Sequence, residues 1–192
     1  MRNILKVLLG AALCLPVVAL AHTGAGSVTG FFSGFAHPLM GVDHLLAMVA
    51  VGLWAAQIGG AARWQVPTAF VTLMLLGGAL GMSGFSLPYI ESGVVGSVML
   101  LGLLIAVSCR PSNAVSMAIV SFFALFHGHA HGAEMPVLLG AIAYSCGFAL
   151  TTASLHAVGL ALGGAVRGGG HDRLTRLAGA GIALAGAWLA VA

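Results

Sequence analysis

Charged residues are scarce in this sequence. Seven Lys or Arg and four Asp or Glu occur among 192 residues, which is 6% of the chain, whereas about 25% of the residues of a soluble domain are charged. Hydrophobic residues make up 60% of the chain, and the mean hydropathy is +1.09. This composition excludes an ordinary soluble domain and indicates an integral membrane protein embedded in the lipid bilayer.

Other absences narrow the function. Of the three cysteines, Cys14 falls in the N-terminal apolar run that has the pattern of a signal peptide, and Cys109 and Cys146 fall in or beside later apolar runs, so we expect no disulfide framework. The chain contains no Walker-type phosphate loop, so it is not an ATPase. Its arginines are dispersed rather than clustered, so we expect no nucleic-acid partner. The Gly-x-x-x-Gly spacing is frequent and fits close packing of helices within one chain. The alternative is helix dimerisation, and hence an oligomer.

Residues 1–21 have the pattern of a cleaved signal peptide. Arg2 and Lys6 give a basic start, an apolar core follows, and residues 19–21 form a small-x-small cleavage site. The mature chain is then 22–192, a single membrane domain. A retained anchor is the alternative.

Six apolar segments follow the signal, and each is close to the length of about 20 residues that a membrane span needs. They cover residues 38–58, 66–83, 92–108, 113–129, 136–164 and 174–191. The expected fold class is therefore all-α, a polytopic membrane helix bundle with six transmembrane helices.

All five arginines of the mature chain fall in alternate connections between these segments or, for Arg176, at the very start of the segment that follows: Arg63, Arg110, Arg167, Arg173 and Arg176. The positive-inside rule makes these connections cytoplasmic. We therefore expect a multi-pass protein of the bacterial cytoplasmic (inner) membrane, with both mature termini on the periplasmic side.

Histidines gather near the end of the fourth segment. If this stretch is helical at about 100° per residue, His127, His131 and Glu134 share one face, at relative angles of roughly 0°, 40° and 340°. Two imidazoles and a carboxylate suit a borderline divalent ion such as nickel, cobalt, zinc or copper. His129 points away, which makes it a secondary candidate. The alternative is a solvated loop, because two glycines interrupt the stretch.

A second cluster stands at the start of the first segment. His37 and His44 are seven residues apart, so a continuous helix brings them within about 20° of each other, and Pro38 suits its first turn. Asp43 is the only acidic residue within the six segments, and a charge there is functional by default. The alternative is an Asp that stays hydrated near the surface.

The topology brings both clusters to the external side at similar depth. If the two helices touch, nitrogen and oxygen ligands face one another at the outer mouth of the bundle. The primary metal ligands are then His37, Asp43, His44, His127, His131 and Glu134, and the secondary candidates are His22, His129 and His156. His156 is placed near the cytoplasmic side, either as an exit ligand or as a packing residue. The soft donors Cys146, Met40, Met48, Met74 and Met82 line a path or, more commonly in a membrane core, simply pack.

Both clusters resemble the signatures of the HupE/UreJ family of membrane nickel permeases. H-P-x-x-G-x-D-H matches residues 37–44, and F-H-G-x-A-H-G-x-E matches residues 126–134. The resemblance implies a secondary transporter, not an enzyme, that takes up nickel for hydrogenase or urease maturation, with cobalt as a cargo of some relatives. The divalent metal is then the transported substrate, and no cofactor is expected.

Two other functions are compatible with parts of the sequence. A membrane metal sensor or chaperone needs the same ligands without transport. A rhomboid-like intramembrane serine protease is a remote alternative, because Gly-x-Ser-Gly occurs at residues 81–84. Its nucleophile and base must come within about 3 Å, whereas the predicted topology separates Ser83 from His156.

Overall fold

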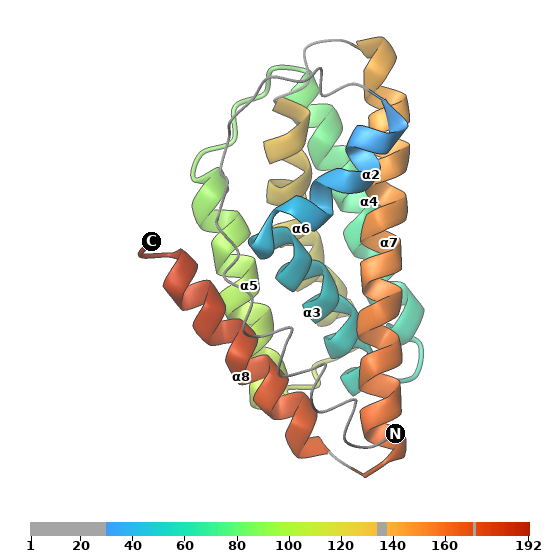
Figure 1. The fold of residues 1–192 in the computed structure, drawn as a ribbon, viewed down its shortest axis with the longest axis vertical. Helices are drawn as coiled ribbons and strands as arrows, with labels where there is room; N and C mark the ends of the chain where they lie inside the picture. The colour runs from blue at the N-terminus through green and yellow to red at the C-terminus, as the bar shows by residue number, and fades with distance from the viewer. Residues whose placement is uncertain (1–29, 134–137, 171) are drawn as a thin grey trace.

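The structure, a computed structural model, describes residues 30–133, 138–170 and 172–192 (Figure 1). The predicted signal peptide, His22 and Glu134 lie outside these residues. Within the described ranges the chain is all-α, as predicted. Its helices are α2 (Phe31–Met40), α3 (Val42–Ile58), α4 (Ala62–Met82), α5 (Ile90–Ala106), α6 (Asn113–Ala133), α7 (Leu138–Gly168) and α8 (Asp172–Leu189).

Three of these helices, α4, α6 and α7, are long and apolar enough to cross a membrane, and the bent pair α2 and α3 makes up to four. Helix α5 is equally apolar but has only 17 residues. Helix α8 has 18 residues, three of them charged: Asp172, Arg173 and Arg176. By length and composition, the described residues therefore contain three candidate membrane spans, or four with the bent pair, where six were expected.

The first predicted span is not one helix. The chain bends by 87° between α2 and α3, and Gly41 at the break is extended, with φ −99° and ψ 122°. Pro38 lies inside α2, so the prediction that it sits in the first turn is wrong. A Cβ at Gly41 would lie 2.7 Å from the Asp43 carboxylate and 3.2 Å from His44 Nδ1. Glycine at the break therefore lets both side chains fold back against the backbone.

Helices α4 and α6 are in direct backbone contact. A Cβ at Gly128 would collide with the carbonyl oxygen of Met74, and one at Gly132 would collide with that of Gly78. The glycines that threatened to break the histidine-bearing stretch are thus helical and allow close packing, which confirms the packing interpretation. This close approach brings the α6 histidines against the α4 side chains.

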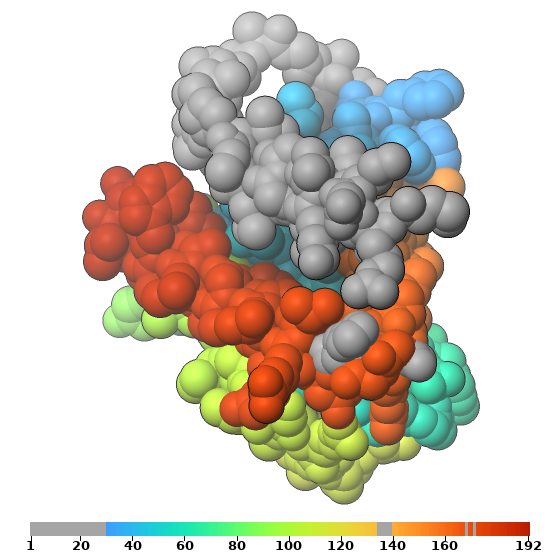
Figure 2. All heavy atoms as spheres, turned by 60° about the horizontal axis from the view of Figure 1, so that its bottom comes forward, coloured from blue at the N-terminus to red at the C-terminus, as the bar shows by residue number. Residues whose placement is uncertain are grey.

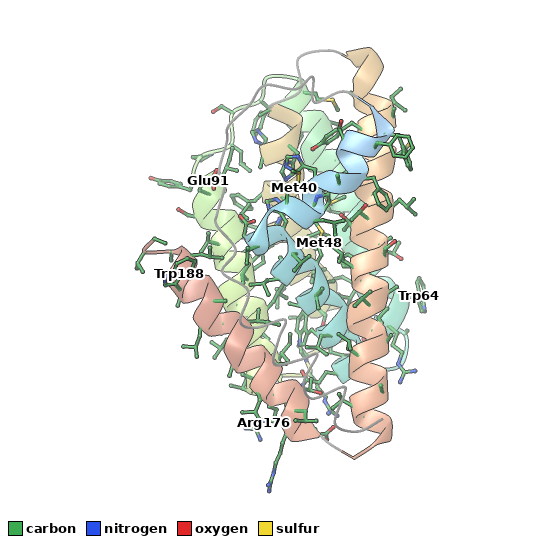
Figure 3. All side chains as sticks on the ribbon, viewed as in Figure 1. Met40, Met48, Trp64, Glu91, Arg176 and Trp188 are labelled. Carbon is green, nitrogen blue, oxygen red and sulfur yellow. The ribbon has the colours of Figure 1, made fainter. Side chains whose placement is uncertain are left out.

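The arginine-bearing connections meet at one end of the bundle. Arg167 donates to the Ala56 carbonyl at 3.1 Å, and Arg176 donates to the Ala106 carbonyl at 2.9 Å. Each guanidinium therefore satisfies an acceptor near the carboxyl end of α3 or α5, where a cation is favourable. Arg176 and Glu91 lie toward opposite ends of the molecule (Figure 3).

The outer faces of the bundle are apolar, as contact with lipid requires. Ile142 of α7 is 74% exposed and Leu184 of α8 is 72% exposed, whereas Trp54 and Phe70 are fully buried. With the arginine-bearing end turned forward, α8 forms an outer flank beside α5 (Figure 2). Helix α2 instead packs on α7, and the Thr151 hydroxyl donates to the Phe35 carbonyl at 2.6 Å.

Candidate metal site

Four histidines from three helices form one cluster of imidazole rings. His37 of α2 lies 4.3 Å from His131 of α6, and His44 of α3 lies 4.6 Å from His131 and 4.8 Å from His127, all between ring centroids. His44 Nε2 and His131 Nε2 are 2.6 Å apart. The structure therefore brings together four of the six residues that the sequence singled out as primary ligands.

Because of the bend at Gly41, His37 and His44 come close to His131 for a different reason than the sequence predicted. The sequence argument put His37 and His44 on one face of a continuous helix, but they belong to different helices that approach His131 from two directions. His127 and His131 do share one helical face, as predicted, because α6 continues through both. The cluster is thus assembled by tertiary packing of three helices.

The ring nitrogens of the cluster are not spaced as the ligands of a metal ion. Among the residues that the structure describes, no three His, Cys, Asp or Glu side chains could hold a metal together as they stand. The 2.6 Å separation of the two Nε2 atoms is that of a hydrogen bond. An ion with metal–nitrogen bonds of about 2.1 Å would hold two nitrogens roughly 2.9–3.4 Å apart. Binding of such an ion would therefore require the two Nε2 atoms to move apart by less than about 1 Å.

Asp43 contacts the cluster through His44. Its Oδ1 accepts hydrogen bonds from the His44 backbone N–H at 2.7 Å and from the ring Nδ1–H at 2.8 Å. A carboxylate on one imidazole nitrogen fixes the tautomer and makes the other nitrogen the better ligand. Asp43 therefore directs the lone pair of His44 Nε2 toward the other histidines.

Ser97 has the same relation to His127. The Ser97 hydroxyl donates to the Val94 carbonyl at 2.6 Å, so its oxygen accepts from His127 Nε2 at 2.9 Å. This assigns the proton of His127 to Nε2 and leaves a lone pair on Nδ1, a buried atom without a hydrogen-bond partner among the residues that the structure describes. Ser97 is a functional candidate that the sequence did not identify, and the available signal was a hydroxyl in the middle of an apolar helix.

Aromatic residues of α7 close the cluster on one side. Phe148 lies 4.7 Å from His131, and Tyr144 lies 6.0 Å from His37, between ring centroids. A cavity of about 30 Å³ is bordered by His131, Tyr144, Phe148 and Met74, enough for one or two water-sized occupants. Aromatic residues in apolar spans carry no local signal, so the sequence did not identify them.

His129 and His156 lie outside the cluster. His129 points away, as predicted, and binds the Phe85 carbonyl in the connection between α4 and α5. His156 is 1% exposed, and its ring lies 5.2 Å from Phe70, which in turn lies 5.7 Å from His127. Helix α7 continues from His156 to Gly168, about 18 Å further at the helical rise, and the placement of His156 near the cytoplasmic side stays a prediction.

The same geometry excludes the protease alternative. Ser83 follows the end of α4, where it is exposed and donates to the Leu80 carbonyl. His156 contacts Phe70, which lies thirteen residues before Ser83 in the sequence, or roughly 20 Å along the helix. These two residues do not form a nucleophile and base pair.

The fold and the cluster define a class, a helical membrane protein with histidines gathered in its interior. The chain matches the family described as HupE / UreJ protein over residues 10–189 and belongs to that family. It is 45% identical over 181 residues to "Protein HupE" of Rhizobium leguminosarum bv. viciae, and the match covers 94% of each chain. No solved structure matches it. Membership places the chain among membrane transport and accessory proteins rather than enzymes.

Proposed function

We propose that the protein is a secondary permease that takes up nickel across the cytoplasmic membrane, with cobalt as an alternative cargo, to supply hydrogenase or urease maturation. The observation that carries this proposal is the contact of His37, His44, His127 and His131 between the helices of the bundle. Imidazole nitrogens suit borderline divalent ions. Family membership favours nickel among those ions.

Two carboxylates complete the proposed capture site. Asp43 lies beside His44, and Glu134 follows α6 in the sequence. Their negative charges would offset the two positive charges of the ion, which neutral imidazoles alone do not. Glu134 enters this proposal on its position in the sequence pattern.

The broken helix supports transport rather than simple binding. Discontinuous helices in transporters expose backbone groups at the substrate site, where one part of the protein moves against another. Here the break at Gly41 separates His37 from His44. A change in the 87° angle between α2 and α3 would move one ligand relative to the others.

The proposed orientation has six spans, the histidine cluster on the external side and the arginine-bearing end in the cytoplasm. Arg167 and Arg176 gather at one end, which fits the positive-inside rule. The membrane potential then favours import, because a divalent cation gains about 4.6 kcal/mol per 100 mV.

The test is metal entry into proteoliposomes that contain the purified protein. Labelled nickel, cobalt, zinc and copper are compared, and the variants are His37→Ala, Asp43→Ala and His131→Ala. We expect saturable nickel entry that all three substitutions abolish while the protein still inserts in the membrane. The matched control is His129→Gln, which leaves entry unchanged because His129 faces the Phe85 carbonyl.

Two results would refute the permease. Tight nickel binding without entry would identify a membrane sensor or chaperone that uses the same ligands. If the protein neither binds nor admits any of the four ions, the histidine cluster has no role in metal binding or transport.

A further inference from the structure

Two thioethers and a hydroxyl meet in the core between three helices. The Thr152 hydroxyl of α7 donates to Met48 Sδ of α3 at 3.2 Å and lies 3.6 Å from Met74 Sδ of α4. All three side chains are at most 3% exposed, so both sulfurs are held near one point. Met48 lies deeper in the bundle than Met40, toward the end that carries Arg176 (Figure 3).

A buried imidazole without partners stands one turn further along α7. His156 follows Thr152 by four residues, so both side chains face the same way, and His156 is 1% exposed. Neither of its ring nitrogens has a hydrogen-bond partner in the part of the chain that the structure describes. Buried polar atoms are rarely left unpaired, and a missing ligand or ion is one explanation.

This group is continuous with the histidine cluster. Phe70, one turn from Met74 on α4, contacts both the His127 ring and the His156 ring. The cavity of about 30 Å³ is bordered by both His131 and Met74. An ion that leaves His131 would therefore meet the Met74 thioether next, on the way toward the arginine-bearing end.

The ligand atoms of Met48, Met74, Thr152 and His156 differ from those of the outer histidine cluster, which has a carboxylate beside it. Thioether, hydroxyl and imidazole are all neutral, and the acidic residues that the structure describes belong elsewhere: Asp43 touches His44, and Glu91 and Asp172 stand in the first turns of α5 and α8. Thioether sulfur favours soft and borderline ions over the hard ions magnesium and calcium. Without a carboxylate the group would bind a divalent cation more weakly than the outer cluster would, and conduction requires sites that an ion can leave.

We propose that Met48, Met74, Thr152 and His156 form an inner transfer site that accepts the metal ion from the outer histidine cluster and rejects hard divalent ions. The inference deepens the proposed permease function and rests on it. The ion passes from imidazole ligands with carboxylates nearby to neutral sulfur and imidazole ligands, and is then released toward the cytoplasmic end.

The test uses selenomethionine-labelled protein with two equivalents of nickel and X-ray absorption at the nickel edge. Nickel–selenium scattering reports contact with methionine, which cysteine sulfur cannot mimic. We expect this signal in the parent protein and its loss in the variant Met48→Leu/Met74→Leu, which nearly conserves side-chain volume. The control is Met99→Leu, because Met99 packs against Gly186 between α5 and α8.

Flux and binding separate this inference from the permease proposal. We expect nickel entry into proteoliposomes to fall about tenfold or more in the double variant and in His156→Gln. Nickel binding at the outer cluster should stay within about twofold, a difference below about 0.5 kcal/mol. The double variant should also admit more magnesium relative to nickel. If the double variant does not reach the membrane, Met48→Leu and Met74→Leu are tested singly.

The experiments distinguish failure of the inner site from failure of the permease. Parent-level nickel entry in the double variant, or the absence of nickel–selenium scattering in the parent protein, overturns the inner site and leaves the permease standing. If the parent protein binds nickel without moving it, the permease fails. The transfer role of the inner site fails with it, and the scattering signal then reports only whether these methionines bind nickel.

Discussion

Substitution of Asp43 by Asn tests how the carboxylate acts on the metal site. Asp43 Oδ1 accepts two hydrogen bonds from His44, one from the backbone and one from the ring. Asn keeps the size of the side chain and one acceptor oxygen but removes the negative charge. The His44 ring therefore stays in place while its Nε2 becomes a poorer electron donor.

The expected loss of nickel affinity in Asp43→Asn follows from these two hydrogen bonds. Loss of the group behind a ligating histidine typically lowers metal affinity 10–100-fold, which is about 1.4–2.7 kcal/mol. Asp43 is 25% exposed at its side chain, so water screens part of its charge and we expect about tenfold. The assay is nickel titration of the purified protein against a competing chromophoric chelator.

A double-mutant cycle with His44→Ala provides the refutation. If Asp43 acts through His44, then Asp43→Asn has little further effect once His44 is gone, and the two free energies are not additive. Fully additive losses would mean that Asp43 binds the ion directly. An unchanged affinity in the single variant would mean that the contact between Asp43 and His44 has no role in binding.

Three further predictions concern other contacts of the site. Ser97→Ala should weaken nickel binding about fivefold, or roughly 1 kcal/mol, because His127 loses the acceptor that fixes its tautomer; unchanged affinity would count against this assignment. Gly132→Ala should lower the thermal midpoint of unfolding by an amount equivalent to about 1–3 kcal/mol, because its Cβ would collide with the Gly78 carbonyl, whereas Gly164→Ala, with open space around its Cβ, should not; equal midpoints would contradict the packing argument. Nickel entry should fall as external pH drops below about 6.5, where imidazoles ordinarily gain a proton and stop binding metal; entry that rises steadily on acidification would refute proton competition.

Local periodicity accounts for what the sequence predicted correctly. The scarcity of charge required a membrane environment, and apolar runs in that environment form helices because lipid offers the backbone no hydrogen-bond partners. The shared face of His127 and His131 followed from the helical repeat alone, and α6 has that repeat. The two arginines whose contacts are described also lie at one end, as alternate placement in the sequence required.

The errors came from extending a local rule through a break. A continuous helix from residue 38 was assumed, so Pro38 was placed at its start and His37 was paired with His44 by periodicity. The extended Gly41 interrupts that helix. Helix α7 likewise ends at Gly168, beyond the predicted end at residue 164.

The class of protein, the residue types of its site and the helical face that carries two of the histidines could all be predicted from the amino-acid sequence. Helix packing was needed to find that His37 and His44 reach the same partner from two helices, that Ser97 and Asp43 orient the rings, and that Phe70 contacts both His127 and His156. The physical reason is the range of the interactions. Helix formation and face alignment depend on residues a few positions apart, whereas these contacts depend on how closely glycine allows distant helices to approach.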